Sequence, residues 1–205
     1  MLKVWGRLNS INVQKAMMAV EELGLAYERL DAGMQFGVTK TPEYLKMNPN
    51  SRVPTIDDDG FVLWESNVIV RYLAAKHSPG ALWPVDPKAR ADIDRWMDWQ
   101  QSHHNPPLTT LFWGLVREPG ARPAAEIEAA KKTMAQMMAM LEERLDGRRW
   151  MGGDAFTMVD CVIGPAMHRW SNVPFERAPL PNVERYYKAM MERPSAKKLL
   201  TLPLT

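Results

Sequence analysis

The sequence predicts an α/β domain with the element order β-α-β-α-β-β-α, followed by an all-α domain. Three observations support this prediction. Short β-prone runs occur only in the first part of the chain, apolar residues further on recur at helical spacing, and a stretch with three prolines and a glycine lies between the two regions. We therefore expect domains over residues 1–78 and 88–205, joined by a linker over residues 79–87.

The chain opens with a compact strand, helix and strand. Residues 2–6 are β-prone, apolar residues recur at helical spacing over residues 13–23, and Gly24 is a typical helix C-terminal stop. Residues 27–31 form a second candidate strand. A unit this compact predicts two parallel strands with a right-handed crossover.

A short helix and a hairpin are expected next. Thr41 and Pro42 predict the cap and first turn of the helix, which Pro49 must end. Residues 53–57 and 61–64 are strand-like and are joined by an Asp-Asp-Gly turn. Because Asp-Gly between apolar runs is a strong hairpin signal, these two strands should be antiparallel.

Two helices flank the linker. Ser66 is expected to cap a helix that ends near residue 77. Residues 88–103 then have helical spacing, and we expect Asn105-Pro106-Pro107 to break or kink that helix before it resumes over residues 108–116.

The rest of the second domain is also helical in period. A long helix is expected over residues 123–145. Thr157, with Asp160 three residues later, resembles a capping box at the start of the next helix. Two last helices should begin near Pro181 and Pro194.

Composition excludes several functional classes. The chain has 205 residues, with 26 Lys plus Arg against 24 Asp plus Glu, and the basic residues form no run, so we expect no nucleic-acid partner. No segment resembles a signal peptide or approaches the roughly 20 apolar residues that span a bilayer, so we expect a cytoplasmic protein without membrane attachment. We also expect no metal and no disulfide, because no metal-ligand spacing occurs among His77, His103, His104, His168 and Cys161.

Several motifs in this order resemble those of the glutathione S-transferase family. They are Ser10-x-Asn12 followed by Lys15, Val53-Pro54, Glu65-Ser66 and Thr157-x-x-Asp160. The resemblance covers essentially the whole chain, is most specific over residues 48–77, and implies a thioredoxin-like fold for the N-terminal domain. The first motif is similar to the bacterial, theta-like or nu-like branch, since Trp5 and Gly6 stand where other classes carry a catalytic tyrosine.

The resemblance implies that glutathione binds along the loops of the first domain. In the family the bond before Pro54 is cis and turns the backbone of Val53 toward the cysteinyl part of glutathione, although most X-Pro bonds are trans. Lys40 and Arg52 are candidates to meet the glycyl carboxylate. The alternative for these two side chains is simple solvation.

The same resemblance places the γ-glutamyl end of glutathione at Glu65 and Ser66. Ser66 would bind its carboxylate and Glu65 its ammonium, at a helix start whose free N–H groups attract anions. The alternative is an ordinary N-cap serine beside a solvated glutamate.

Ser10 and Asn12 are the catalytic candidates by resemblance. A free thiol has a pKa near 8.5, so a hydroxyl or amide donor is needed to stabilise the thiolate of glutathione at neutral pH. Ser10 is the first choice and Asn12 the second, or its partner. Capping of the helix that follows is the alternative role for both, and Asn12 can cap while Ser10 donates.

The second substrate is expected beside the proline-containing helical segment. Candidates for an apolar pocket with a few polar groups are His103, His104, Phe112 and Trp113. The equally good alternative is that the aromatic residues are core and the histidines lie at the surface. A methionine stripe over residues 134–141 predicts packing, with part of a dimer interface as the alternative, and Cys161 is expected to be a buried thiol without a catalytic role.

Together with the expected cytoplasmic location, the resemblance thus implies a homodimeric glutathione transferase that conjugates glutathione to a small electrophile, with a role in detoxification. Glutathione is the expected co-substrate and no metal is expected. A glutathione-dependent peroxidase or disulfide reductase remains an alternative, and so does a noncatalytic interaction module with this fold.

Overall fold

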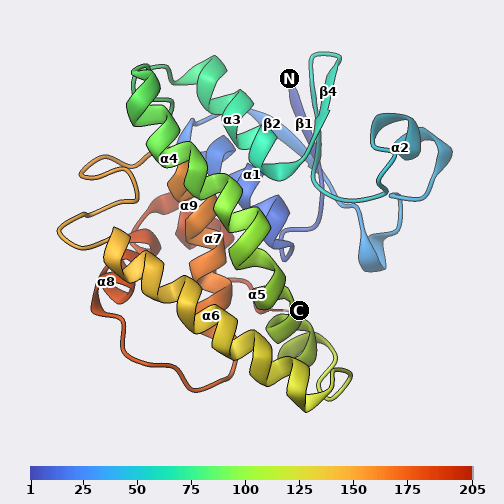
Figure 1. Ribbon diagram of the computed structural model, residues 1–205. Coiled ribbons are helices and arrows are strands. Elements are labelled where there is room, and N and C mark those ends of the chain that lie inside the picture. The colour runs from blue at the N-terminus through green and yellow to red at the C-terminus, as the bar shows by residue number, and fades with distance from the viewer. Residues whose placement is uncertain (205) are drawn as a thin grey trace.

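The computed structural model describes residues 1–204, in which a sheet with its helices is followed by a helical domain (Figure 1). The first part contains strands β1 (Leu2–Trp5), β2 (Tyr27–Leu30), β3 (Thr55–Asp58) and β4 (Phe61–Trp64), helices α1 (Ile11–Glu22), α2 (Pro42–Met47) and α3 (Ser66–His77), and the 3-10 turn η1 (Met34–Phe36). The second contains α4 (Pro87–Trp99), α5 (Asn105–Phe112), α6 (Ala124–Arg144), α7 (Met158–Asn172), α8 (Pro181–Met191), α9 (Pro194–Leu199) and two π-helical turns, η2 (Gln100–His104) and η3 (Trp113–Arg117). This arrangement confirms the predicted fold class.

The sheet has the strand order β2-β1-β3-β4. β1 and β2 are parallel and the other two pairs are antiparallel, which confirms the predicted parallel pair and the predicted hairpin. The hairpin turn is Asp59-Gly60, where both residues have positive φ, 52° and 94°. Two such residues give the tight turn whose twist matches that of the flanking strands.

Two helical segments differ from the expectations. Ser66 is the first residue of α3, while Glu65, with φ 73°, occupies the N-cap position, so the predicted serine cap is wrong. The chain also continues helically through Pro106 and Pro107, so of the expected break or kink the break is wrong. The π-helical turn before these prolines widens the hydrogen-bonding pattern to i→i+5, so the chain passes residues that lack an N–H donor.

Helix α1 lies at the centre of the molecule, packed on α3 on one side and on α7 and α9 on the other. One continuous apolar core runs through both parts of the chain, with Met17 and Val162 among its fully buried members. Met134 and Met138 of α6 also belong to it, as the packing interpretation of the methionine stripe predicts, whereas Met140 is 42% exposed. Cys161 is buried, as expected.

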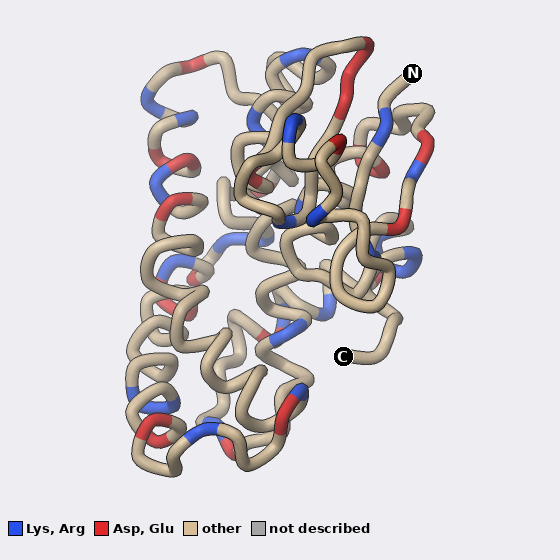
Figure 2. The backbone as a smooth tube through the Cα atoms, turned by 90° about the vertical axis from the view of Figure 1, so that its right-hand side faces the viewer, with Lys and Arg blue, Asp and Glu red and all other residues tan. Residues whose placement is uncertain are grey.

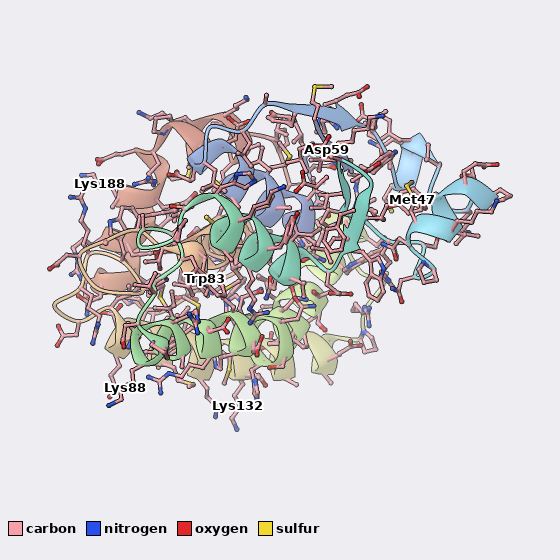
Figure 3. The ribbon with its side chains drawn as sticks, turned by 90° about the horizontal axis from the view of Figure 1, so that it is seen from above. Met47, Asp59, Trp83, Lys88, Lys132 and Lys188 are labelled. Carbon is pink, nitrogen blue, oxygen red and sulfur yellow. The ribbon has the colours of Figure 1, made fainter. Side chains whose placement is uncertain are left out.

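Charges are spread over the surface of this core. Segments with Lys or Arg and segments with Asp or Glu are interspersed along the chain, with long uncharged stretches between them (Figure 2). Seen from above, α2 projects with Met47 at one end of the molecule, while Lys88 and Lys132 lie on the outer side of the helical domain (Figure 3). No helix within residues 1–204 is both long and apolar enough to cross a bilayer.

The start of α7 is fastened by a buried carboxylate. Asp160 accepts hydrogen bonds from the backbone N–H groups of Thr157 (2.9 Å) and Met151 (3.0 Å) and from the hydroxyl of Tyr186 (3.2 Å). Burial raises the pKa of Asp160 to about 6. The predicted capping box therefore also anchors the loop before α7 and the helix α8.

A buried lysine joins the two parts of the chain. Lys15 of α1 donates to Oε1 of Gln100 at 2.6 Å and to Oε1 of Gln101 at 3.3 Å, both in η2. Burial, reinforced by the positive charge of Arg169 and opposed by the negative charge of Glu65, lowers the pKa of Lys15 to about 7. The ammonium thus lies at a junction where its charge is poorly solvated.

Asp160→Ala is expected to destabilise the protein by about 3 kcal/mol, because three buried donors lose their acceptor. Urea unfolding measures this loss. Asp154→Ala, an exposed position in the same loop, is the matched control and should change the free energy of unfolding by less than about 0.5 kcal/mol. Equal effects of the two substitutions would contradict the anchoring role.

Lys15→Met is expected to flatten the dependence of stability on pH between about 7 and 10. The folded-state pKa of Lys15 is about 7, below the ordinary 10.5, so the unfolded chain binds the extra proton over this range. The free energy of unfolding is therefore highest above the ordinary pKa of 10.5. It decreases as the pH falls toward the folded pKa of about 7, with a slope of up to about 1.4 kcal/mol per pH unit. Urea unfolding at several pH values measures this slope. Lys132→Met, on the exposed face of α6, is the control. Identical slopes for both variants would contradict the prediction.

Candidate functional site

A cavity of about 990 Å³ lies between the loops of the first domain and the helices of the second. This volume is at the upper end of the range usual for small-molecule sites. The residues predicted to bind glutathione all line it: Ser10, Asn12, Lys40, Arg52, Val53, Pro54, Glu65 and Ser66. The fold therefore gathers four separate loop and helix-start segments around one space.

Ser10 occupies the N-cap position of α1, with φ −86° and ψ 123°. Its hydroxyl makes no capping hydrogen bond, and the side chain is buried at the cavity wall. Gly6 permits this geometry, because a Cβ there would lie only 2.4 Å from a methyl carbon of Val13 in α1. The close approach of strand end and helix start directs Ser10 to the cavity.

Asn12 is the second residue of α1, so the interpretation that it caps this helix is wrong. Its side chain lines the cavity, and its buried Oδ1 finds no hydrogen-bond partner among the described residues. An amide oxygen without a partner has a free acceptor site next to Ser10. Ser10 and Asn12 thus lie at one wall of the cavity.

The peptide bond between Val53 and Pro54 is cis, as the family resemblance implies. The segment before it is held by a buried polar network in which Tyr44 Oη and Asn48 Nδ2 both donate to the carbonyl oxygen of Arg52, at 2.6 and 2.9 Å. Thr55 Oγ1 lies 2.8 Å from Tyr44 Oη and 3.0 Å from Asn48 Nδ2. Because the hydroxyl proton of Tyr44 goes to the carbonyl, Thr55 donates to Tyr44, and this part of the network is satisfied.

The wall at α3 combines a turn with a helix start. Glu65 is exposed and Ser66 is 5% exposed, and both line the cavity. The side chain of Glu65 makes no capping hydrogen bond, although its carbonyl accepts the first one of α3, from Ile69 at 2.9 Å. The free N–H groups of this helix start thus point to the side of the cavity that carries Ser66.

The second wall is a stripe along the helical segment from η2 to η3. Every fourth residue lines the cavity, namely Gln101, Asn105, Thr109, Trp113 and Arg117. A regular α-helix has 3.6 residues per turn, so a stripe of period four drifts around it. The two π-helical turns have a wider turn and keep the stripe on one side.

This stripe corrects the predicted electrophile pocket. Trp113 lines the cavity, but His103, His104 and Phe112 are not among its lining residues. His103 is exposed beside Ser102, while His104 and Phe112 are eight residues apart on the buried side of the segment. Burial lowers the pKa of His104 to about 3, so this imidazole is neutral.

Three arginines of the cavity lining were not predicted from the sequence. Arg7, Arg117 and Arg169 line the cavity, from the loop after β1, from η3 and from α7. The stripe of period four was visible in the sequence and contains Arg117. Arg7 and Arg169 have no such signal, because only the tertiary fold brings them together.

No group of three or more His, Cys, Asp or Glu side chains within residues 1–204 has the arrangement of a metal site. The cavity lining described by the structure contains one carboxylate, that of Glu65, and five basic side chains. Such a lining fits an anionic, carboxylate-bearing ligand.

Known proteins match the whole chain. The models for the glutathione S-transferase N-terminal and C-terminal domains match residues 1–75 and 124–189. The chain is 39% identical to glutathione S-transferase GstB of Escherichia coli K12, over 100% of both chains, and 30% identical to glutathione S-transferase 3 of Zea mays, over 99% of this chain and 95% of the relative. A crystal structure of the theta class glutathione S-transferase from Xanthomonas axonopodis pv. citri with glutathione bound is similar with a TM-score of 0.95 and 40% identity, covering 100% of this chain and 99% of that one.

The two domain models together cover more than half of the chain, and the similar relatives cover essentially all of it. These similarities confirm the predicted family, its two-domain fold and the predicted transferase class. The chain belongs to the glutathione S-transferase family.

Proposed function

We propose that this protein binds glutathione in the cavity between its two domains, stabilises the thiolate and transfers it to a small electrophile. The observation that carries the proposal is the placement of Ser10. Its hydroxyl lies at the wall of the cavity, next to the start of α1, and is not used for capping. It is therefore available as a donor to sulfur.

The remaining contacts are those that the family resemblance implies, and the charge and position of the residues support them. The carboxylate of the γ-glutamyl group is assigned to Ser66 at the start of α3, and its ammonium to Glu65, the acid of the lining. The backbone of Val53 before Pro54 is assigned to the cysteinyl part. Lys40 and Arg52 are assigned to the glycyl carboxylate, since both basic side chains line the same cavity.

Ser10 and Asn12 have different roles in this proposal. Ser10 donates its O–H to the sulfur and holds it as thiolate. Asn12, whose Oδ1 lacks a partner in residues 1–204, orients the ligand or the serine through its amide. One preorganised donor to an anion contributes on the order of 3 kcal/mol in favourable cases.

The wider setting is also part of the proposal. We assign a homodimeric, cytoplasmic protein that acts in detoxification, with domains over residues 1–78 and 88–205 and a linker over 79–87. Support for the division comes from the helix bounds, since α3 ends at His77 and α4 begins at Pro87. The electrophile pocket is assigned to the part of the cavity that contains Trp113.

Reduced glutathione at about 10 mM is expected to raise the thermal midpoint. With a dissociation constant of about 0.1 mM, saturation adds roughly 2.7 kcal/mol, which corresponds to about 5 °C or more for a chain of this size. Differential scanning fluorimetry at constant pH and ionic strength measures the shift. Ser66→Ala should show a smaller shift, and no shift for the wild type would favour the interaction-module alternative.

Ser10→Ala is expected to lower kcat/KM for glutathione conjugation to an aryl halide by about 10-fold or more, because the thiolate loses its hydroxyl donor. Asn12→Ala should cost severalfold. The pH profile of the Ser10 variant should shift upward, since the pKa of bound thiol returns toward its free value. Stopped or continuous absorbance assays measure both quantities.

Ser102→Ala, at an exposed serine outside the described cavity lining, is the matched control and should leave the kinetics unchanged. If neither Ser10→Ala nor Asn12→Ala lowers conjugation while glutathione still binds, the catalytic assignment is wrong. Turnover of an organic hydroperoxide in excess of the aryl halide would instead favour the peroxidase alternative.

A further inference from the structure

A buried guanidinium lies at the wall of the cavity. Arg169 of α7 is only 7% exposed, yet it lines the cavity. Its guanidinium lies over the ring of Phe112, 4.1 Å from the centroid, and its buried Nε finds no hydrogen-bond partner within residues 1–204. A side chain packed on an aromatic ring with a free donor is preorganised for a ligand.

A second guanidinium enters from the turn that carries Ser10. The backbone N–H of Ser10 donates to the carbonyl oxygen of Arg7 at 3.1 Å, so both side chains start from one tight turn. Nη1 of Arg7 reaches to 3.2 Å from the place where a Cβ on Gly33 would stand. Arg7 therefore reaches from the turn of Ser10 to the loop that contains Gly33, another residue of the cavity lining.

These charges act on one another. The positive charges of Arg117 and Arg7, after burial, lower the pKa of Arg169 to about 9, and burial with Arg117 lowers that of Arg7. In the described part of the chain, neither Arg7 nor Arg169 forms a salt bridge with a carboxylate. Buried cations are costly unless an anion is paired with them.

Glutathione leaves these arginines without an anion. In the proposed binding mode its two carboxylates go to Ser66 and to the pair Lys40 and Arg52, and its ammonium goes to Glu65. Glu65 is also the one acid in the described lining. Within residues 1–204 no carboxylate pairs with Arg7 or Arg169, which leaves the second substrate as a source of the matching charge.

We propose that the electrophile of this enzyme carries a carboxylate, which binds Arg169 and Arg7 while the reacting carbon faces the sulfur above Ser10. This inference deepens the proposed function and rests on it. Trp113 also lines the cavity, and the guanidinium of Arg117 lies over both its ring and that of Phe112, on which Arg169 packs, so Trp113 offers a flat surface nearby to an aromatic or planar electrophile. Bidentate pairing of a guanidinium with a carboxylate fixes the orientation of the substrate.

With an activated aryl chloride, glutathione displaces chloride from the ring. The thiolate sulfur forms a bond to the ring carbon that bears chlorine, the carbon–chlorine bond then breaks, and chloride leaves with the bonding electrons. The thiol proton passes to solvent. The carboxylate takes no part in bond making and remains paired with the arginines.

The test compares two electrophiles that differ only in charge. They are the chloro-dinitrobenzoate with chlorine para to the carboxylate and flanked by the nitro groups, and its neutral benzamide. Each rate is divided by its uncatalysed rate with glutathione, which removes the difference in intrinsic reactivity. The wild type should prefer the carboxylate by about 10-fold or more, the size expected for a charge-assisted hydrogen bond.

Arg169→Gln should lower this preference by about 10-fold, and Arg169→Lys should retain part of it. Arg7→Gln provides a second variant, independent of the packing of Arg169 on Phe112. Arg149→Gln removes the same charge from an exposed position and should leave the preference unchanged. An unchanged preference in both Arg169→Gln and Arg7→Gln, or a raised KM for glutathione in its place, would overturn the inference.

A binding measurement separates this inference from the proposed function. Calorimetry with the unreactive dinitrobenzoate that lacks chlorine detects the anion site without any transfer. Binding to the wild type that is lost in Arg169→Gln supports the site even where no conjugation occurs. Absence of such binding by a protein that still binds glutathione and converts the neutral benzamide overturns the inference and leaves the proposed function intact.

Discussion

The burial of α1 between the two parts of the chain is the constraint on which the site depends. Nine of its twelve residues are buried, and it packs on α3 on one side and on α7 and α9 on the other. A helix held on both sides cannot shift along its axis without opening the core. Its first turn, with Ser10 and Asn12, is therefore fixed relative to Arg169 of α7 and to Ser66 of α3.

The same burial explains the low pKa of Lys15. An ammonium at the centre of the molecule is tolerated because Gln100 and Gln101 accept from it, and its pKa falls to about 7 because those two amides replace water incompletely. Both glutamines belong to η2, the π-helical turn at the head of the cavity-lining stripe. The core of one domain is thus linked directly to the wall of the site formed by the other.

The sequence predicted the parts of the site that local chemistry determines. The Asp-Gly turn, the capping box of Asp160 and a helix start near Ser66 follow from residue types at short spacing, whereas the family resemblance supplied the cis bond and the assignment of Val53 and Ser66 to glutathione. The prediction was wrong where residue spacing along a helix had to show which side chains face the cavity. His104 and Phe112 were assigned to the pocket by their chemistry, but the two π-helical turns place Trp113 at the cavity and leave these two in the core.

Arg7 shows why some residues of the site can be identified only from the tertiary structure. In the sequence it is one basic residue in a short loop, and nothing local distinguishes it from a solvated arginine. In the fold its backbone supports Ser10 while its guanidinium shares a cavity with that of Arg169, more than a hundred positions away. Because one turn carries both Arg7 and the proposed sulfur donor, a displacement of this turn would move both side chains together. In the proposed mechanism, substrate orientation and thiol activation are therefore coupled through the backbone of residues 7–10.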